Sequence, residues 1–272
     1  MSVKEELKNG SFAAKGYYED SEGYKWFYKY NQANGVAILC PEEIIFVEQT
    51  EESACVQCNG IKVRSVKPAV APIPHDVLKI PEFVNGFRVV GVDDFAFFKT
   101  ATQAFSWPPQ RVYTKVNIHS SIQYIGVAAF QGCDAITDIS EGLAAETIGA
   151  SAFSGCKKLE GVSFKPGTKT IGRFAFFDCK DLRWIVFSKG ITTIDECAFA
   201  NCHLLSQIDL PDSIESVALD AFSGSHCRIT YPEKLGFAVP SVRWRMRTNN
   251  PIKKFCFNLL NRESLFSASR YQ

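Results

Sequence analysis

The sequence lacks the long apolar segments that a membrane-spanning helix needs. None of its 272 residues falls in a run of 18 apolar residues. Its first 20 residues contain no apolar core of a secretory signal. The apolar content of 46% is nevertheless too high for a disordered chain. We therefore expect a folded protein that is cytoplasmic, or that is exported or surface-associated by a non-classical route.

Motifs of the common catalytic sites are also missing. The patterns G-x-x-x-x-G-K-[ST], G-x-G-x-x-G, H-E-x-x-H and G-x-S-x-G do not occur. Histidine is scarce, with four residues in all, and we expect His119 and His226 at the surface. Without a nucleophile, a base or a metal constellation, the sequence predicts a protein that is not an enzyme. We expect no cofactor, no metal ion and no small-molecule substrate.

Acidic residues are scarce only at the C-terminal end. Residues 228–272 hold two acidic and nine basic residues, whereas residues 1–227 hold 27 acidic and 21 basic ones. A basic tail on an acidic body could bind an anionic membrane or nucleic acid. The alternative is a tail that is solvated or packed against its own body. The candidate anion contacts are Arg243, Arg245, Arg247, Lys253 and Lys254.

Ten cysteines are present, a number that would indicate disulfides in a short secreted chain. This chain is long and shows no signal, so we expect reduced thiols. Cys55 and Cys58 form a C-x-x-C pair with only Cys40 as a conceivable third ligand. That is a weak signal for metal or redox chemistry, because no second ligand pair follows at a suitable spacing.

A repeat of 23 residues dominates the middle of the chain. Ala-Phe pairs recur at this spacing, each preceded by an apolar residue five positions before the Phe. Three positions after the Phe stands a Cys, or Ser225 in the last copy. The phenylalanines are Phe130, Phe153, Phe176, Phe199 and Phe222. Units this short cannot enclose a core alone, so we expect stacked coils in which each Phe contacts the Phe of the next coil.

The cysteine column of the repeat is best explained by packing. A linear column of Cys133, Cys156, Cys179 and Cys202 cannot supply the tetrahedron that zinc needs. Parallel stacking also keeps equivalent Cβ atoms farther apart than a disulfide allows. We therefore interpret these four residues as small buried apolar groups.

The second half of each unit alternates between apolar and polar residues and predicts a short strand. The I-G-x-x-A-F half contains small residues and predicts a returning turn, with one helical or 3₁₀ turn. An earlier, stretched copy contains Val92 and Phe97, with an insertion between Lys99 and Arg111.

Copies such as IGASAFSGCKKLEGVSF and IGRFAFFDCKDLRWIVF resemble the BspA-type leucine-rich repeat. The segment KIPEFVNGFRVVGVDDFAF resembles the opening repeat of that family. The resemblance implies a right-handed repeat solenoid, with a strand-lined concave face and short helical or 3₁₀ turns on the convex side. It also implies a non-enzymatic interaction role, since family members include surface-associated adhesins.

The ends of the chain leave the repeat. We divide the chain into a β-rich N-terminal cap (1–76), the leucine-rich repeats (77–232) and a basic C-terminal cap or tail (233–272). Within the cap, YKWFYKYNQANGVAIL predicts two strands around Asn34-Gly35, and EEIIFVEQ and GIKVRSV predict two more.

The outward residues of the repeat strands predict a binding strip for a protein partner, whose identity the sequence does not give. Trp184 stands out among them, because an exposed Trp is typical of interface hot spots. Covering of Trp184 by the tail or by the insertion is the alternative. The strip comprises Lys115, Asn117, Asp138, Ser140, Gly161, Ser163, Arg183, Trp184, Val186, Gln207 and Asp209.

Overall fold

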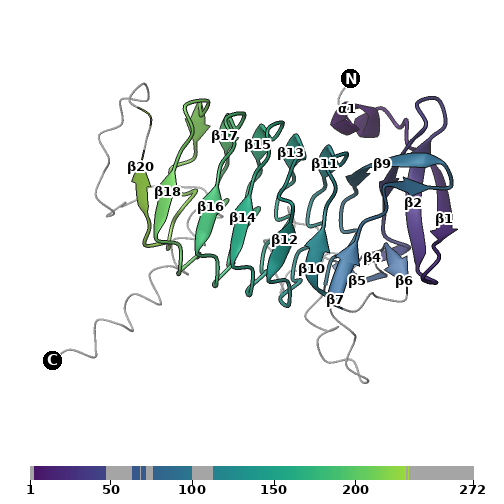
Figure 1. Cartoon of the computed structure of the whole chain (residues 1–272), viewed down its shortest axis with the longest axis horizontal. Coiled ribbons are helices and arrows are strands. Elements are labelled where there is room, and N and C mark those ends of the chain that lie inside the picture. The colour runs from purple at the N-terminus through teal and green to yellow at the C-terminus, as the bar shows by residue number, and fades with distance from the viewer. Residues whose placement is uncertain are drawn as a thin grey trace. The chain divides into compact units, whose positions relative to one another are not determined.

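The repeat region is a row of stacked coils continuous with an N-terminal sheet (Figure 1). The computed structural model describes residues 3–46, 63–67, 69–71, 76–99, 113–230 and 232. The chain divides into two units, Met1–Thr230 and Tyr231–Gln272. The fold described below is that of the first unit. The predicted tail and the insertion after Lys99 lie outside the described residues.

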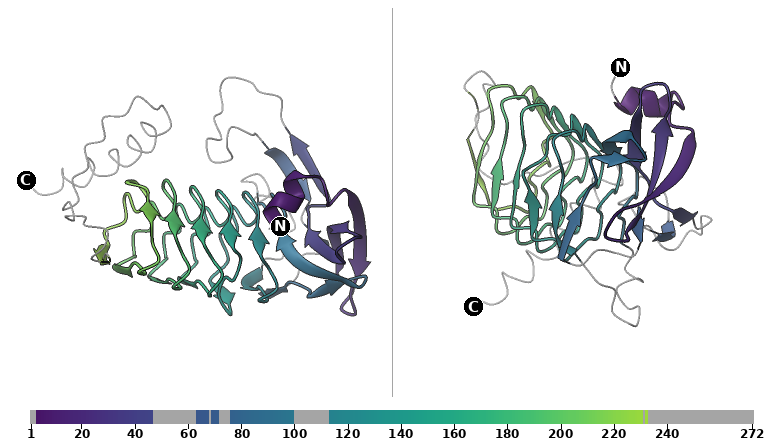
Figure 2. Two further views of the ribbon diagram at one scale, coloured as in Figure 1. Left: turned by 90° about the horizontal axis from the view of Figure 1, so that it is seen from above. Right: turned by 45° about the vertical axis from the view of Figure 1, so that its right-hand side comes forward.

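Each coil contributes one short strand to a long sheet that runs through the array. Neighbouring strands pair in parallel, with like residues opposite one another, such as Ile148 and Ile171. The sequence places a turn at these positions, whereas the structure forms a two-residue ladder there (Figure 2). The strands are β9 (Phe87–Val92), β11 (Tyr124–Ile125), β13 (Thr147–Ile148), β15 (Thr170–Ile171), β17 (Thr193–Ile194) and β19 (Ser216–Val217).

The predicted strands of the second half of each unit are present and form a second row, here called the strand row. Its pairing is parallel in three groups, with β10 between β7 and β12, β14 beside β16, and β18 beside β20. The strands are β7 (Asp76–Lys79), β10 (Tyr113–Asn117), β12 (Asp138–Ser140), β14 (Gly161–Ser163), β16 (Trp184–Val186), β18 (Gln207–Asp209) and β20 (Arg228–Thr230).

The predicted phenylalanine column is confirmed. Six rings from Phe97 to Phe222 stack one on the next, with centroids 5.0–5.4 Å apart and interplanar angles of 3–13°. Phe164 and Phe187 form a second, shorter stack, and their edges meet Phe176 and Phe199. The core of the array is therefore a set of identical contacts repeated from coil to coil.

The segment before each Phe is a hydrogen-bonded turn, where the sequence suggests a helical or 3₁₀ turn. The residue two positions before the Phe has a positive φ in five coils: Phe95, Ala128, Ser151, Phe174 and Cys197, at 51–60°. A residue in the left-handed region cannot continue a right-handed helix. Hydrogen bonds between coils complete the turn, since the N–H of Phe153 donates to the carbonyl of Ala175 at 2.7 Å. Equivalent bonds of the same length join the neighbouring coils.

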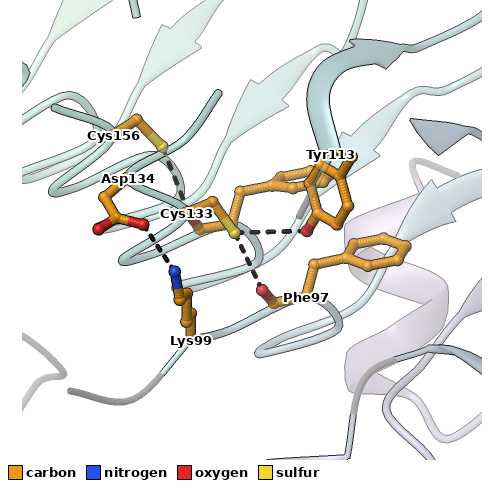
Figure 3. A network of polar contacts seen from close by, with 7 residues as sticks. Phe97, Lys99, Tyr113, Cys133, Asp134 and Cys156 are labelled. Atoms are coloured by element: carbon orange, nitrogen blue, oxygen red, sulfur yellow. Dashed lines mark hydrogen bonds and ion pairs between the residues drawn. The ribbon is translucent and has the colours of Figure 1, made fainter. Parts of the chain in front are cut away.

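The cysteine column is buried, as expected, and also has a polar role. The thiol of each of these residues donates to the carbonyl of the Phe in the preceding coil, as from Cys179 to Phe153 at 3.3 Å. In the last copy Ser225 makes the same bond to Phe199 at 2.8 Å. Figure 3 shows the first of these contacts, where Cys133 also meets the Tyr113 hydroxyl at 3.4 Å. Burial raises the pKa of Cys133 to about 11, so the thiol stays protonated and keeps its donor.

The N-terminal strands continue the long sheet. The predicted strand pair is confirmed as β2 (Lys25–Asn31) and β3 (Val36–Leu39), and β1 (Ala14–Glu19) pairs with β2. β3 then pairs in parallel with β9, so this region joins the first coil through backbone hydrogen bonds. The predicted strands further along appear as β4 (Glu43–Phe46) and β5 (Val63–Lys67).

Short elements complete the N-terminal region. The helix α1 (Val3–Lys8) contributes Val3 to a cluster that includes Ile38 and Tyr124. β6 (Val70–Ala71) pairs with β2, and β8 (Phe83–Val84) pairs with β9. The turn between β8 and β9 is Asn85-Gly86, with φ of 47° and 83°. Two successive left-handed residues are typical of a two-residue hairpin turn.

Polar side chains also join the N-terminal sheet to the coils. The Lys29 ammonium on β2 forms an ion pair with Asp93, which follows β9 and is 8% exposed. The adjacent Asp94 accepts hydrogen bonds from the N–H of Val127 at 2.7 Å and from the Tyr124 hydroxyl at 3.2 Å. Burial, followed by the charge of Asp93, raises the pKa of Asp94 above its ordinary value.

Candidate binding surface

The strand row presents the predicted strip as two parallel lines of side chains. Lys115 lies opposite Asp138, and Asn117 lies opposite Ser140. In the next pair of strands, Gly161 lies opposite Trp184, and Ser163 lies opposite Val186. β16 and β18 are neighbours along the row, which brings Gln207 and Asp209 next to Trp184 and Val186 (Figure 1).

Alternation along the strands fixes which residues face out. The middle residues Val116, Ile139, Val162, Ile185 and Ile208 are 0–9% exposed and fill the core. On the outer side, Lys115, Trp184, Val186, Gln207 and Asp209 are exposed, while Asn117, Asp138, Ser140 and Ser163 are half-buried. The period of two residues in the sequence therefore gives the correct face at each of these positions.

Arg183 differs from the other predicted strip residues because it precedes β16. Its N–H donates to the carbonyl of Glu160 at 2.8 Å, which continues the ladder by one bond. The residue is exposed and directly precedes Trp184. Arg183 thus places a positive charge at the start of the strand, outside the two lines of strip residues.

Trp184 is 48% exposed and lies on a glycine. A Cβ at position 161 would fall 1.9, 2.1 and 2.4 Å from the indole Cε2, Cζ2 and Cδ2 atoms. Three bonded ring atoms at such similar distances mean that Gly161 lies under the face of the indole rather than beside its edge. Gly161 is consequently buried although its side of the strand faces outward. The sequence shows the exposed Trp, but only the pairing of β14 with β16 shows this stacking.

Val186 extends the apolar surface beside Trp184. It is 55% exposed and lies two residues along the same strand. The polar strip residues around this pair are partly bound to each other. The Gln207 amide donates to both carboxylate oxygens of Asp209 at 3.3 Å, and Ser140 donates to Asp138 at 3.0 Å. The strip is thus a small apolar centre among hydrogen-bonding groups.

The candidate anion contacts of the tail, and the Cys55–Cys58 pair, cannot be placed on this surface. Arg243, Arg245, Arg247, Lys253 and Lys254 lie outside the described residues, as do Cys55 and Cys58. Within the described part of the chain, no group of three or more His, Cys, Asp or Glu is arranged to hold a metal ion. No helix in that part is long and apolar enough to cross a membrane.

His119 and His226, which the sequence predicts at the surface, differ in exposure. His226 is exposed, as expected. His119 is half-buried, and its Nε2 lies 3.2 Å from the carbonyl oxygen of Pro81. His119 is therefore only partly exposed at the surface. Burial lowers the pKa of His119 below its ordinary value.

Comparison with protein families identifies the repeat. Residues 99–230 match the BspA type leucine rich repeat region in six copies. The array therefore belongs to the BspA-type leucine-rich repeat family. No curated protein showed a significant match to the sequence.

The solved structure of PcpA supports this fold, and two further structures align less closely. The pneumococcal vaccine antigen PcpA aligns with a TM-score of 0.54 and 21% identity over 79% of this chain and 50% of that chain. A leucine rich cell surface protein of Faecalibacterium prausnitzii aligns with a TM-score of 0.45 and 18% identity, over 79% of this chain and 54% of its own. The T. pallidum protein TpLRR aligns with a TM-score of 0.40 and 23% identity, over 57% of this chain and 58% of its own. This chain thus spans between half and three fifths of the length of those proteins.

Proposed function

We propose that this protein is a non-enzymatic interaction module that binds a protein partner through the strand row. The observation that supports the proposal most is the exposed pair of Trp184 and Val186 on β16, within the strand row. Tryptophan is enriched among the residues that dominate binding energies. The repeat family supports an interaction role in general terms. An adhesin-like or host-directed role is a narrower form of the same proposal.

The proposal includes the arrangement that the resemblance implies. In it the solenoid is right-handed, the strand row lines its concave face, and residues 1–76 cap one end of the array. Backbone pairing of β3 with β9 supports the capping role, because it covers the first coil with the N-terminal sheet. The boundaries of the repeats at 77 and 232 remain predictions.

Capture from native lysate tests the role of the strand row. The wild-type chain and the Trp184→Ala variant are used as baits, with Leu219→Ala as the matched control. Leu219 is 62% exposed and lies in a turn outside the strand row. We expect a partner that the wild type and Leu219→Ala retain and that Trp184→Ala loses at least tenfold. Equal capture by a folded Trp184→Ala variant would contradict the proposal.

The charge of the tail supports a second candidate function, which is binding of an anionic membrane or nucleic acid. Such binding depends on counterion release and falls steeply with salt. Sedimentation with vesicles containing anionic lipid and gel shifts with duplex DNA, each between 50 and 200 mM salt, would reveal it as a loss of at least tenfold. Absence of binding at low salt would exclude this second candidate.

A further inference from the structure

Trp184 presents a flat aromatic face to the solvent. Its inner face rests on Gly161, where a Cβ would fall 1.9–2.4 Å from three indole carbons. The direction of a Cβ at this position is roughly perpendicular to the sheet, so the indole lies parallel to the strand row. The other face is open, because the side chain is 48% exposed. Trp184 therefore forms a platform and not a knob that could insert into a partner's pocket.

Hydrogen-bonding groups border the platform on the neighbouring strands. β14 and β18 lie on either side of β16 in the strand row (Figure 1). Asp209 and Gln207 on β18 supply carboxylate oxygens and an amide, and Ser163 on β14 supplies a hydroxyl. Neighbouring parallel strands lie about 4.8 Å apart, a spacing comparable with the width of a six-membered sugar ring. A ring stacked on Trp184 would bring its hydroxyl groups over these polar side chains. Carboxylates accept from hydroxyls, while amides and serine hydroxyls can donate or accept.

The charges around the platform favour an uncharged ligand. Charges of both signs lie along the strand row: Lys115, Arg183 and Arg228 are positive, and Asp138 and Asp209 are negative. An indole face by itself attracts cations. Here, however, the exposed Arg183 directly precedes Trp184, and Arg228 lies in register with Gln207. Those two positive charges oppose a cationic ligand, and Asp209 opposes an anionic one.

The exposed apolar area on the strand row is small, which bears on the size of the ligand. Stable protein interfaces bury about 800 Å² on each partner around a well-packed apolar core. The exposed apolar side chains on the strand row are Trp184 and Val186 among the described residues. That surface is of the size that one face of a sugar ring covers.

From this geometry we propose that the Trp184 platform binds a pyranose ring of a neutral saccharide. The C–H groups on one face of the ring stack on the indole, whose face carries negative quadrupole charge. Asp209, Gln207 and Ser163 bind the hydroxyl groups at the edge of the ring. The inference rests on the proposed function, in that it takes the strand row as the binding face. The ring could belong to a free polysaccharide or to a glycan attached to a protein.

Affinity electrophoresis of the full-length chain tests the proposal. Native gels contain soluble neutral polysaccharides, namely hydroxyethylcellulose, laminarin, galactomannan, mannan or dextran. We expect retardation of the wild type in at least one gel, with unchanged retardation of Leu219→Ala. Trp184→Ala should weaken binding at least tenfold and Asp209→Ala several-fold. No retardation of the wild type in any gel, or full retardation of Trp184→Ala, would overturn the inference.

Two further variants separate loss of the platform from loss of folding. Trp184→Phe keeps a smaller flat ring over Gly161, so we expect an intermediate affinity. Gly161→Ala keeps the indole but lifts it from the sheet, because a Cβ has no room beneath it. We expect it to weaken saccharide binding several-fold while circular dichroism still shows the folded array. Wild-type affinity in the folded Gly161→Ala variant would contradict a flat platform.

The saccharide proposal can fail separately from the proposed function. If a protein captured through Trp184 stays bound after enzymatic deglycosylation, and no polysaccharide retards the wild type, the saccharide inference is wrong and the interaction module stands. If Trp184→Ala keeps both the captured partner and saccharide binding, both proposals are wrong. Loss of the captured partner after deglycosylation would support a protein-attached glycan, and retardation in the gels would support a free polysaccharide.

Discussion

The inner coils and the junction with the N-terminal sheet are held together by different kinds of contact. In the inner coils, like residues meet at every step, as in the Phe stack and the Cys–carbonyl bonds. At the junction, each contact occurs once, as between Lys29 and Asp93 or between Asp94 and Val127. In the inner coils neutral side chains make the repeated contacts, whereas the junction contains the buried charged group Asp93. The inner coils therefore gain stability from many equivalent contacts. The junction gains it from a few specific contacts.

The largest effect should follow from removing one ring of the stack. Phe176→Ala deletes a fully buried side chain that contacts Phe153, Phe164 and Phe199. We expect a loss of about 3–5 kcal/mol in the free energy of unfolding, measured by urea titration. Leu219→Ala, at an exposed site, should change it by less than about 0.5 kcal/mol. A similar small change for Phe176→Ala would show that the coils do not depend on the stack.

Close packing of the backbones gives the next effect. A Cβ at position 149 would lie 2.5 Å from the carbonyl carbon of Gly126 in the preceding coil. Gly149→Ala should therefore cost about 1–3 kcal/mol, the usual range for overpacking. Gly190→Ala is the matched control, because its Cβ would meet no atom closer than 3.3 Å. Equal thermal denaturation midpoints for the two variants would refute the importance of this close approach.

The cysteine column offers a smaller and more selective test. Cys179→Ala removes the thiol donor from the carbonyl of Phe153, which still accepts from the N–H of Cys156 at 3.2 Å. The loss should therefore be that of one hydrogen bond, about 0.5–1.5 kcal/mol. Cys179→Ser keeps a donor, and Ser225 already fills this role in the last coil. We expect the Ser variant to lie closer to the wild type than the Ala variant in urea titration. The reverse order would mean that the column acts through apolar burial alone.

The junction should respond to pH in a way that the inner coils do not. Because the pKa of Asp94 is raised in the folded protein, ionisation of this group opposes folding. Its cost is absent below the pKa of the unfolded chain and grows as pH rises through the folded pKa. Asp94→Asn should therefore raise the melting temperature slightly at pH 7, and the gain should vanish near pH 3. A gain that is independent of pH would show that ionisation of Asp94 does not oppose folding.

Sequence reasoning succeeded where a contact is repeated. The column from Phe130 to Phe222 and the alternation around Ile185 each recur every 23 residues, so every copy confirms the others. It was less successful where local geometry decided the outcome. The left-handed conformation at Ala128 and Phe174 gives a hydrogen-bonded turn where a helical turn was expected, and neither residue type predicts this conformation.

By itself, the sequence determined the period, the stacked core and the outward face of the strand row, because one relation between residues 23 apart specifies all three. Only the tertiary structure decided that β3 pairs with β9, that Lys29 meets Asp93 and that Trp184 lies flat on Gly161. The first two contacts join segments far apart in the chain and occur once, so no pattern signals them. The third depends on which side-chain rotamer fits over a glycine in the adjacent coil, and packing sets that choice.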